Sequence, residues 1–187
     1  MEKTLQQYER IIGICRDIFA KKMKDYGVAW RILRPSSITD QIFIKARRIR
    51  SIEMKGTMKV HEDVNSEYIG IINYGIMAMV QLERGISDED DLTPDETLRL
   101  YLAGFNRARE LLLSKNHDYD EAWRDMRIHS FTDLILMKIK RVKQIEDHGG
   151  QTIISEGVEA NYLDMINYAV FALIKLEEKA KRIGHGA

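Results

Sequence analysis

One stretch of the chain occurs twice, and any fold must accommodate both copies. Residues 22–53 align without a gap with residues 115–146, and 15 of the 32 aligned residues are identical. Trp30 aligns with Trp123, so both tryptophans of the chain fall at the same position of the repeat. A match of this length indicates duplication of a single unit. The aligned pairs include Asp25/Asp118, Tyr26/Tyr119, Arg31/Arg124, Thr39/Thr132, Lys45/Lys138, Arg48/Arg141, Tyr68/Tyr162 and Asn73/Asn167.

Apolar side chains recur at helical spacing along most of the chain, and no stretch has a convincing strand pattern. Thr39 or Ser37 is expected to cap the second helix, whereas Thr93-Pro94 with Glu96 forms a capping box that starts the fourth. The pattern therefore predicts an all-α fold with six main helices. Their expected bounds are 4–23, 38 or 40 to about 54, 62–84, 94–115, 132–147 and 155–183.

An acidic stretch separates the two copies. It divides the chain into a first helical repeat over 1–86, a linker over 87–93 and a second repeat over 94–187. A lone three-helix unit of this size is marginal, and its long third helix is apolar around more than half of its circumference. We therefore expect the repeats to pack about a pseudo-two-fold axis as one helical bundle, with both tryptophans against a shared core. Two separate units on a linker are the alternative.

The composition narrows the classes of protein and partner. Apolar residues make up 44% and charged residues 31%, as in soluble globular proteins. The formal net charge is zero, so no global basic field recruits nucleic acid, and any phosphate contact must come from a local patch. No apolar run approaches the ~20 residues of a membrane span, and the N-terminus lacks a signal-peptide pattern. A single cysteine, Cys15, fits a core position and a cytoplasmic protein.

Carboxylates on the last predicted helix suggest a metal site. At about 100° per residue, Glu156, Asp164 and Asn167 fall on one broad face among large apolar side chains. A buried carboxylate requires a metal, a cation or a proton, so this face is a candidate Mg²⁺ site, with Glu159 as a further ligand. Alternatively, Glu156 lies in the first turn and complements the helix dipole, while Asn167 bonds across the repeat interface.

The first copy lacks one of these residues. Glu62 and Asn73 are present, but Gly70 stands where the second copy has Asp164. The difference indicates a loss of a ligand in the first copy. We therefore expect metal-dependent activity mainly in the second copy, where Asp164→Asn should abolish it and leave the fold intact.

Cations beside aromatic residues suggest a second kind of site. Lys45 and Arg48 lie one helical turn apart, as do Lys138 and Arg141, and arginines follow both tryptophans. Such groups suit a phosphate-bearing, stackable ligand such as a nucleotide. The alternatives are a solvated basic face with internal salt bridges, and tryptophans that serve as core anchors. The candidate nucleotide-binding residues are Lys45, Arg48, Lys138, Arg141, Arg124, Asn167, Tyr119 and Trp123.

The order of these residues resembles the nucleotide-modification-associated domain family. The order is K-x-x-DYG-x-x-W, then K-x-x-R, then E-x7-D-x-x-NY. The resemblance covers most of both copies, and it implies a role in nucleotide or DNA-base metabolism. In the first copy it is carried by Lys22, Asp25, Tyr26, Gly27, Trp30, Lys45, Arg48, Glu62, Asn73 and Tyr74. In the second it is carried by Lys115, Asp118, Tyr119, Trp123, Lys138, Arg141, Glu156, Asp164, Asn167 and Tyr168.

The acidic helix is more distantly similar to MazG-like nucleoside triphosphate pyrophosphohydrolases, although their EExxE segment is absent here. This similarity implies that Glu156 and Asp164 are catalytic and, with Glu159, hold Mg²⁺ for cleavage between the α- and β-phosphates. The alternative function is a non-catalytic helical module that binds a nucleic acid or a protein through its basic helices. The sequence is compatible with a homo-oligomer.

Overall fold

The computed structural model describes residues 1–57 and 63–184, and all regular secondary structure within these ranges is helical. Each copy contributes a long helix, a short 3₁₀ helix and two more long helices, which confirms the predicted all-α fold. None of the described helices combines the length and apolarity that crossing a bilayer requires. The elements are α1 (Glu2–Tyr26), η1 (Ala29–Ile32), α2 (Pro35–Lys55), α3 (Val64–Arg84), α4 (Pro94–Tyr119), η2 (Ala122–Asp125), α5 (Ile128–Asp147) and α6 (Val158–Gly184).

The second helix of each copy begins earlier than predicted. α2 starts at Pro35, which suits a first helical position because it has no backbone N–H to satisfy. α5 starts at Ile128, and neither helix has a side-chain cap. The proposed cap Thr39 is instead buried inside α2. The capping box at Thr93 is present, because it depends only on residues within the first turn.

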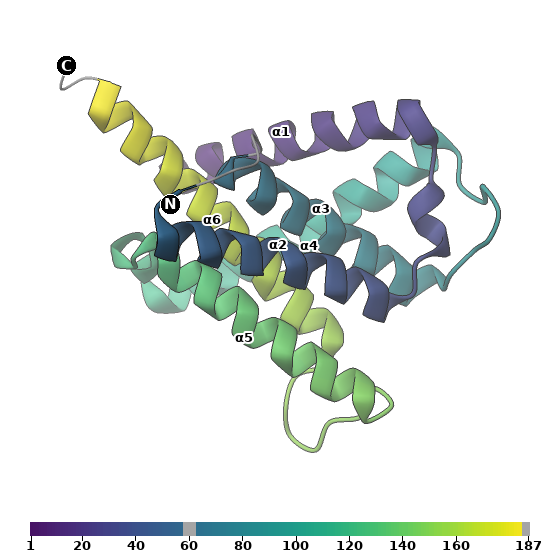
Figure 1. Cartoon of the computed structure of the whole chain (residues 1–187). Helices are drawn as coiled ribbons and strands as arrows, with labels where there is room; N and C mark the ends of the chain where they lie inside the picture. The colour runs from purple at the N-terminus through teal and green to yellow at the C-terminus, as the bar shows by residue number, and fades with distance from the viewer. Residues whose placement is uncertain (58–62, 185–187) are drawn as a thin grey trace.

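The third helices of the two copies form the centre of the bundle. α3 packs against α6, α2 packs on α3, and α5 packs on α6. α2 and α5 also lie side by side, and α1 and α4 cover other faces of α3 and α6 (Figure 1). A Cβ at Gly75 would lie only 2.8 Å from Ile166 Cγ1, so the glycine permits the close approach of α3 and α6. Because both central helices are apolar around most of their surface, they require cover on all sides.

Reciprocal contacts relate the two copies by a pseudo-two-fold axis. The hydroxyl oxygens of Thr39 and Tyr162 lie 2.5 Å apart, and those of Tyr68 and Thr132 lie 2.7 Å apart. Each pair joins the second helix of one copy to the third helix of the other. Two equivalent surface ion pairs also join the second helices of the two copies: Lys143 binds Asp40, and Arg50 binds Asp133. The repeats are thus interlocked, as predicted, rather than joined only by the linker.

The two tryptophans differ in burial. Trp123 is 6% exposed and belongs to the main core, as expected. Trp30 is only partly buried, and packs against the edge of that core and against a small cluster around Val28 and Leu92. Cys15 is a fully buried core residue. The partial exposure of Trp30 coincides with a pocket in the first copy.

Candidate functional site

A pocket of about 570 Å³ lies in the first copy, between α1, η1, α2 and α3. Its volume falls within the range of small-molecule sites, which are typically apolar with a few polar groups. The aromatic lining residues are Phe19, Tyr26, Trp30 and Tyr74. The polar lining residues are Lys22, Lys45, Ser66 and Asn73. The pocket therefore offers aromatic faces next to two positive charges.

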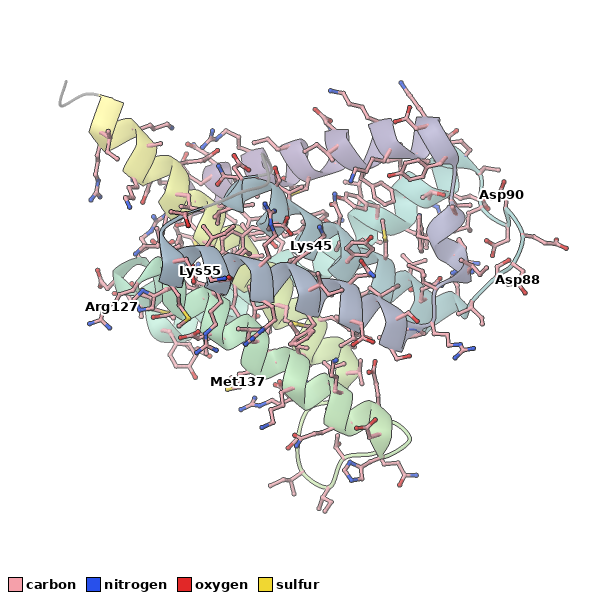
Figure 2. All side chains as sticks on the ribbon, in the orientation of Figure 1. Lys45, Lys55, Asp88, Asp90, Arg127 and Met137 are labelled. Atoms are coloured by element: carbon pink, nitrogen blue, oxygen red, sulfur yellow. The ribbon has the colours of Figure 1, made fainter. Side chains whose placement is uncertain are left out.

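Residues of the repeated signature converge on this pocket from three parts of the sequence. Lys22 and Tyr26 lie four residues apart near the end of α1, and therefore on the same side of the helix. Gly27 ends α1 with a φ of 62°, a left-handed conformation that favours glycine, and turns the chain toward η1 and Trp30. α2 contributes Lys45, which is labelled in Figure 2, and α3 contributes the Asn-Tyr pair of the signature.

The two lysines of the pocket have different electrostatic surroundings. Lys45 Nζ lies 3.4 Å from Glu67 Oε2 and 6.0 Å from the centre of the Tyr74 ring. Glu67 is buried and also binds Arg48. Lys22, in contrast, has no ion-pair partner within the described residues. The pocket thus contains a positive charge that no carboxylate of residues 1–57 and 63–184 offsets at contact distance.

At the equivalent place in the second copy, a carboxylate of the protein lies between the two lysines. Asp164 is 4% exposed and lies 2.5 Å from Lys115 Nζ and 2.6 Å from Lys138 Nζ. These lysines are the counterparts of the two lysines of the pocket. Burial lowers the pKa of Lys115, but the hydrogen bond to Asp164 and the negative charges around the ammonium together outweigh this effect, so the pKa is raised. Trp123 stacks on Phe171, with ring centres 4.2 Å apart.

The carboxylate on the third helix has a different position in the two copies. The second copy has Asp164, whereas the first has Gly70 there and Glu67 one turn earlier. A Cβ on Gly70 would lie 2.6 Å from Lys45 Cε, so the lysine stem crosses α3 over the glycine. Asn161 replaces the glutamate in the second copy, and its buried Oδ1 has no hydrogen-bond partner within the described part of the chain. Gly70 therefore makes space, rather than only marking a lost ligand.

The predicted metal ligands are not brought together. α6 begins at Val158, so the expected helical start at residue 155 is wrong and Glu156 precedes the helix, exposed. Glu159 forms an ion pair with Arg107, and Asp164 is held by its two lysines. Over residues 1–57 and 63–184, no group of three or more acidic, histidine or cysteine side chains could hold a metal ion. The first-copy counterpart, Glu62, lies outside the described residues.

Asn167 has the structural role that the sequence left as an alternative. Its Oδ1 accepts a hydrogen bond from the hydroxyl of Tyr8 at 2.9 Å, and its Nδ2 donates to the carbonyl of Ala108 at 2.9 Å. The tyrosine belongs to the other copy, so the amide bonds across the repeat interface. In the equivalent contact of the first copy, Asn73 Oδ1 accepts a hydrogen bond from the hydroxyl of Tyr101 at 2.6 Å, and Asn73 also lines the pocket.

The remaining candidates are dispersed. Arg124 binds Thr4, Gln7, Glu121 and Glu178 and lies over the Trp123 ring, so its guanidinium is used within the protein. Tyr119 is 69% exposed at the end of α4. Lys138 is buried, whereas Arg141 lines a separate, open pocket of about 660 Å³ with Glu156 and Asn161.

Sequence reasoning placed Lys22, Tyr26, Trp30 and Tyr74 in the signature but not among the site residues. One available signal was the spacing of Lys22 and Tyr26, which puts a cation and an aromatic ring on one side of a helix end. The other was Gly70, whose missing side chain leaves room for a neighbour.

Comparison with known proteins identifies the family. No curated protein and no solved structure matches the chain. The family model for nucleotide modification associated domain 1 matches residues 22–82 and again residues 115–176, which together exceed half of the chain. The more distant similarity to MazG-like proteins finds no support in these matches. Each match runs from the signature lysine of the first helix into the third helix, across the elements that build the pocket. The chain therefore belongs to the nucleotide modification associated domain 1 family, of which it contains two tandem copies.

Proposed function

We propose that the protein binds a nucleotide in the first-copy pocket, as part of nucleotide or nucleic-acid base modification. The observation that carries the proposal is the convergence of Lys22, Tyr26, Trp30, Lys45 and Tyr74 around one cavity. These residues come from three separated segments of the family signature. Their joint location therefore connects the pattern of the family to one ligand-sized space.

The aromatic residues suit a nucleobase. Phe19, Tyr26, Trp30 and Tyr74 offer rings from two sides of the pocket, α1 with η1 and α3. Base–aromatic stacking contributes about 1–3 kcal/mol per base, and it tolerates different bases. Met23 and Met77 complete the apolar lining, and their flexible side chains adapt to the shape of a ring. Trp30 is the strongest candidate for the stacking partner, since it is only partly buried.

The lysines suit a phosphate. Lys22 and Lys45 are the cations among the described lining residues. Glu67 forms an ion pair with Lys45, and the aliphatic part of the Lys45 side chain lies over Gly70 at the wall of the pocket. An ammonium is a compact charge that binds phosphate oxygens without a fixed geometry. Base and phosphate would thus be recognised at neighbouring parts of one cavity.

The residues do not fit the Mg²⁺ site expected from the sequence. Both oxygens of Asp164 are taken by lysines, and Glu159 is paired with Arg107. The described lining of the first-copy pocket contains no carboxylate, histidine or cysteine. These residues therefore favour recognition of a nucleotide over its metal-assisted hydrolysis.

Fluorescence titration tests the proposal. In a Trp123→Phe variant, Trp30 is the sole tryptophan, and a nucleotide that stacks on it should quench its emission in a saturable way. Lys22→Met should weaken binding at least ten-fold in the same background. Its matched control, Lys115→Met, changes the equivalent lysine of the second copy and should leave the affinity unchanged. An absence of quenching and of calorimetric heat with every common nucleotide would overturn the proposal.

A further inference from the structure

We propose that the ligand of the first-copy pocket carries a single phosphate, held between Lys22 and Lys45 over Gly70, and that the second copy fills the same place with its own carboxylate, Asp164. The inference rests on the proposed function and specifies its ligand class, a nucleoside monophosphate. It also assigns one ligand to each chain, although the chain contains two copies.

The second copy shows how the two lysines are used together. Asp164 Oδ1 lies 2.5 Å from Lys115 Nζ, and Oδ2 lies 2.6 Å from Lys138 Nζ. One anionic group thus bridges two ammonium groups from different helices. Lys115 and Lys138 are equivalent by sequence to Lys22 and Lys45. The repeated fold therefore positions Lys22 and Lys45 to share an anion in the same way.

The first copy lacks the bridging carboxylate. Gly70 has no side chain, and both lysines line the pocket at this point. Glu67 supplies the negative charge near Lys45, but it is shared with Arg48, and Lys22 has no partner among the described residues. Two ammonium groups around an open space favour an anion there. An external phosphate would make the contacts that Asp164 makes internally.

The charge of the pocket limits the size of the anion. A phosphate monoester carries about −1.5 to −2 charges at pH 7, which two lysines can match. The described lining has no cation beyond these lysines to meet the further phosphates of a triphosphate. Additional phosphates would therefore extend toward solvent and add little affinity.

In the second copy, side chains of the protein occupy both the place between the two lysines and the face of the tryptophan. The two lysines are paired with Asp164, and Trp123 stacks on Phe171. The first copy has Met77 at the position of Phe171, and Met77 and Trp30 both line the pocket. Neither an anion nor an aromatic ring finds the open contacts that the first copy offers. This asymmetry is the reason to expect one ligand per chain.

Calorimetric titration of the full chain with matched ligands and variants tests the inference. The ligands are a deoxynucleoside, its 5′-monophosphate and its 5′-triphosphate, for each of the four common bases. The variants are Gly70→Asp and Gly70→Asn, which place side chains of the same shape against Lys45 and differ in charge. For the native chain, the monophosphate should bind at least ten-fold more tightly than the nucleoside, the triphosphate no more tightly than the monophosphate, and the stoichiometry should be one. Gly70→Asp should lower monophosphate affinity at least ten-fold relative to Gly70→Asn and leave nucleoside affinity equal in the two.

The outcomes separate this inference from the proposed function. Equal affinity of nucleoside and monophosphate, or equal monophosphate affinity of the two variants, would overturn the proposed phosphate position. Neither result would contradict binding of a nucleotide in the first-copy pocket. A triphosphate that binds ten-fold more tightly than the monophosphate, or two ligands per chain, would overturn the assignment of a single phosphate at a single site. If no nucleoside or nucleotide binds the native chain, the proposed function itself fails. The native series alone decides between these outcomes should either variant fail to fold.

Discussion

The hydroxyl of Tyr101 donates a hydrogen bond to Asn73 Oδ1 at 2.6 Å, so the second copy supports the wall of the first-copy pocket. The Tyr101 ring also stacks on Phe19, another lining residue, with ring centres 4.3 Å apart. The pocket is lined by one copy, yet its shape depends on both. Duplication therefore supplies a scaffold for the site, in addition to a second set of signature residues.

The first prediction concerns this support. Tyr101→Phe leaves the buried Asn73 Oδ1 without its donor, which should destabilise the protein by about 1–3 kcal/mol in a urea denaturation. It should also weaken nucleotide binding, because Asn73 and Phe19 line the pocket. The matched control is Tyr8→Phe, which removes the equivalent bond to Asn167. That control should lose comparable stability and retain its affinity; a loss of affinity in both variants would contradict the proposed role of Tyr101.

The second prediction reverses an expectation drawn from the sequence. Asp164→Asn was expected to leave the fold intact, but the side chains of Asp164 and Lys138 are only 5% and 7% exposed. The substitution leaves a buried ammonium without its carboxylate, and breaking such a pair costs about 3–5 kcal/mol. Chemical denaturation should therefore show a large loss of stability, while nucleotide binding in the first copy persists. A native-like denaturation midpoint would contradict this account of the pair.

The fold was predictable because its signals are local or repeated. Helical spacing and the capping box at Thr93 involve neighbouring residues, and the duplication is visible by alignment. The error at Thr39 has a tertiary cause. Its hydroxyl contacts Tyr162 of the other copy and Glu146, and no local pattern reports these partners. A residue that looked like a helix cap is part of the interface between the repeats.

The site was harder to predict because partners on other helices decide the role of each residue. The position of Asp164 on an apolar face of its helix indicates that the carboxylate needs a partner. It does not indicate that Lys115 and Lys138 are the partners. Gly70 looked like a missing ligand when compared with its aligned residue. Only the packing of Lys45 across α3 shows that the glycine makes room.

The third prediction concerns pH and two equivalent glutamates. Burial raises the pKa of Glu53 and of Glu146 above the ordinary value of 4.5, against the opposing effect of hydrogen bonds from Thr132 and Thr39. Below the unfolded pKa both states are protonated and the groups favour folding fully. As pH rises through the raised folded pKa, this contribution is lost, because the folded state binds its protons more tightly than the unfolded chain.

Replacing both glutamates by glutamine removes this dependence. The melting temperature of Glu53→Gln/Glu146→Gln minus that of the native chain should therefore increase between pH 4 and pH 7. Glu83→Gln/Glu110→Gln, at two exposed positions, removes the same number of charges and serves as the control. A melting-temperature difference that stays constant across this range would show that Glu53 and Glu146 do not set the pH dependence.

The last prediction concerns the equivalent arginines Arg31 and Arg124, which hold different parts of the molecule. Arg31 is 2% exposed and binds both carboxylate oxygens of Asp91 at 2.9 Å, as well as the carbonyl of Gly85 at 2.7 Å. It thereby fastens the acidic linker, whose Asp88 and Asp90 lie at the outer edge of the molecule, to η1 (Figure 2). Arg31→Met removes these charge-assisted bonds, so a glutamyl endopeptidase should cleave the linker at least several-fold faster than in the native chain. Arg124→Met removes bonds to α1 and α6 instead, and should leave linker cleavage near the native rate. Equal acceleration in both variants would indicate general destabilisation, and would contradict a specific hold of Arg31 on the linker.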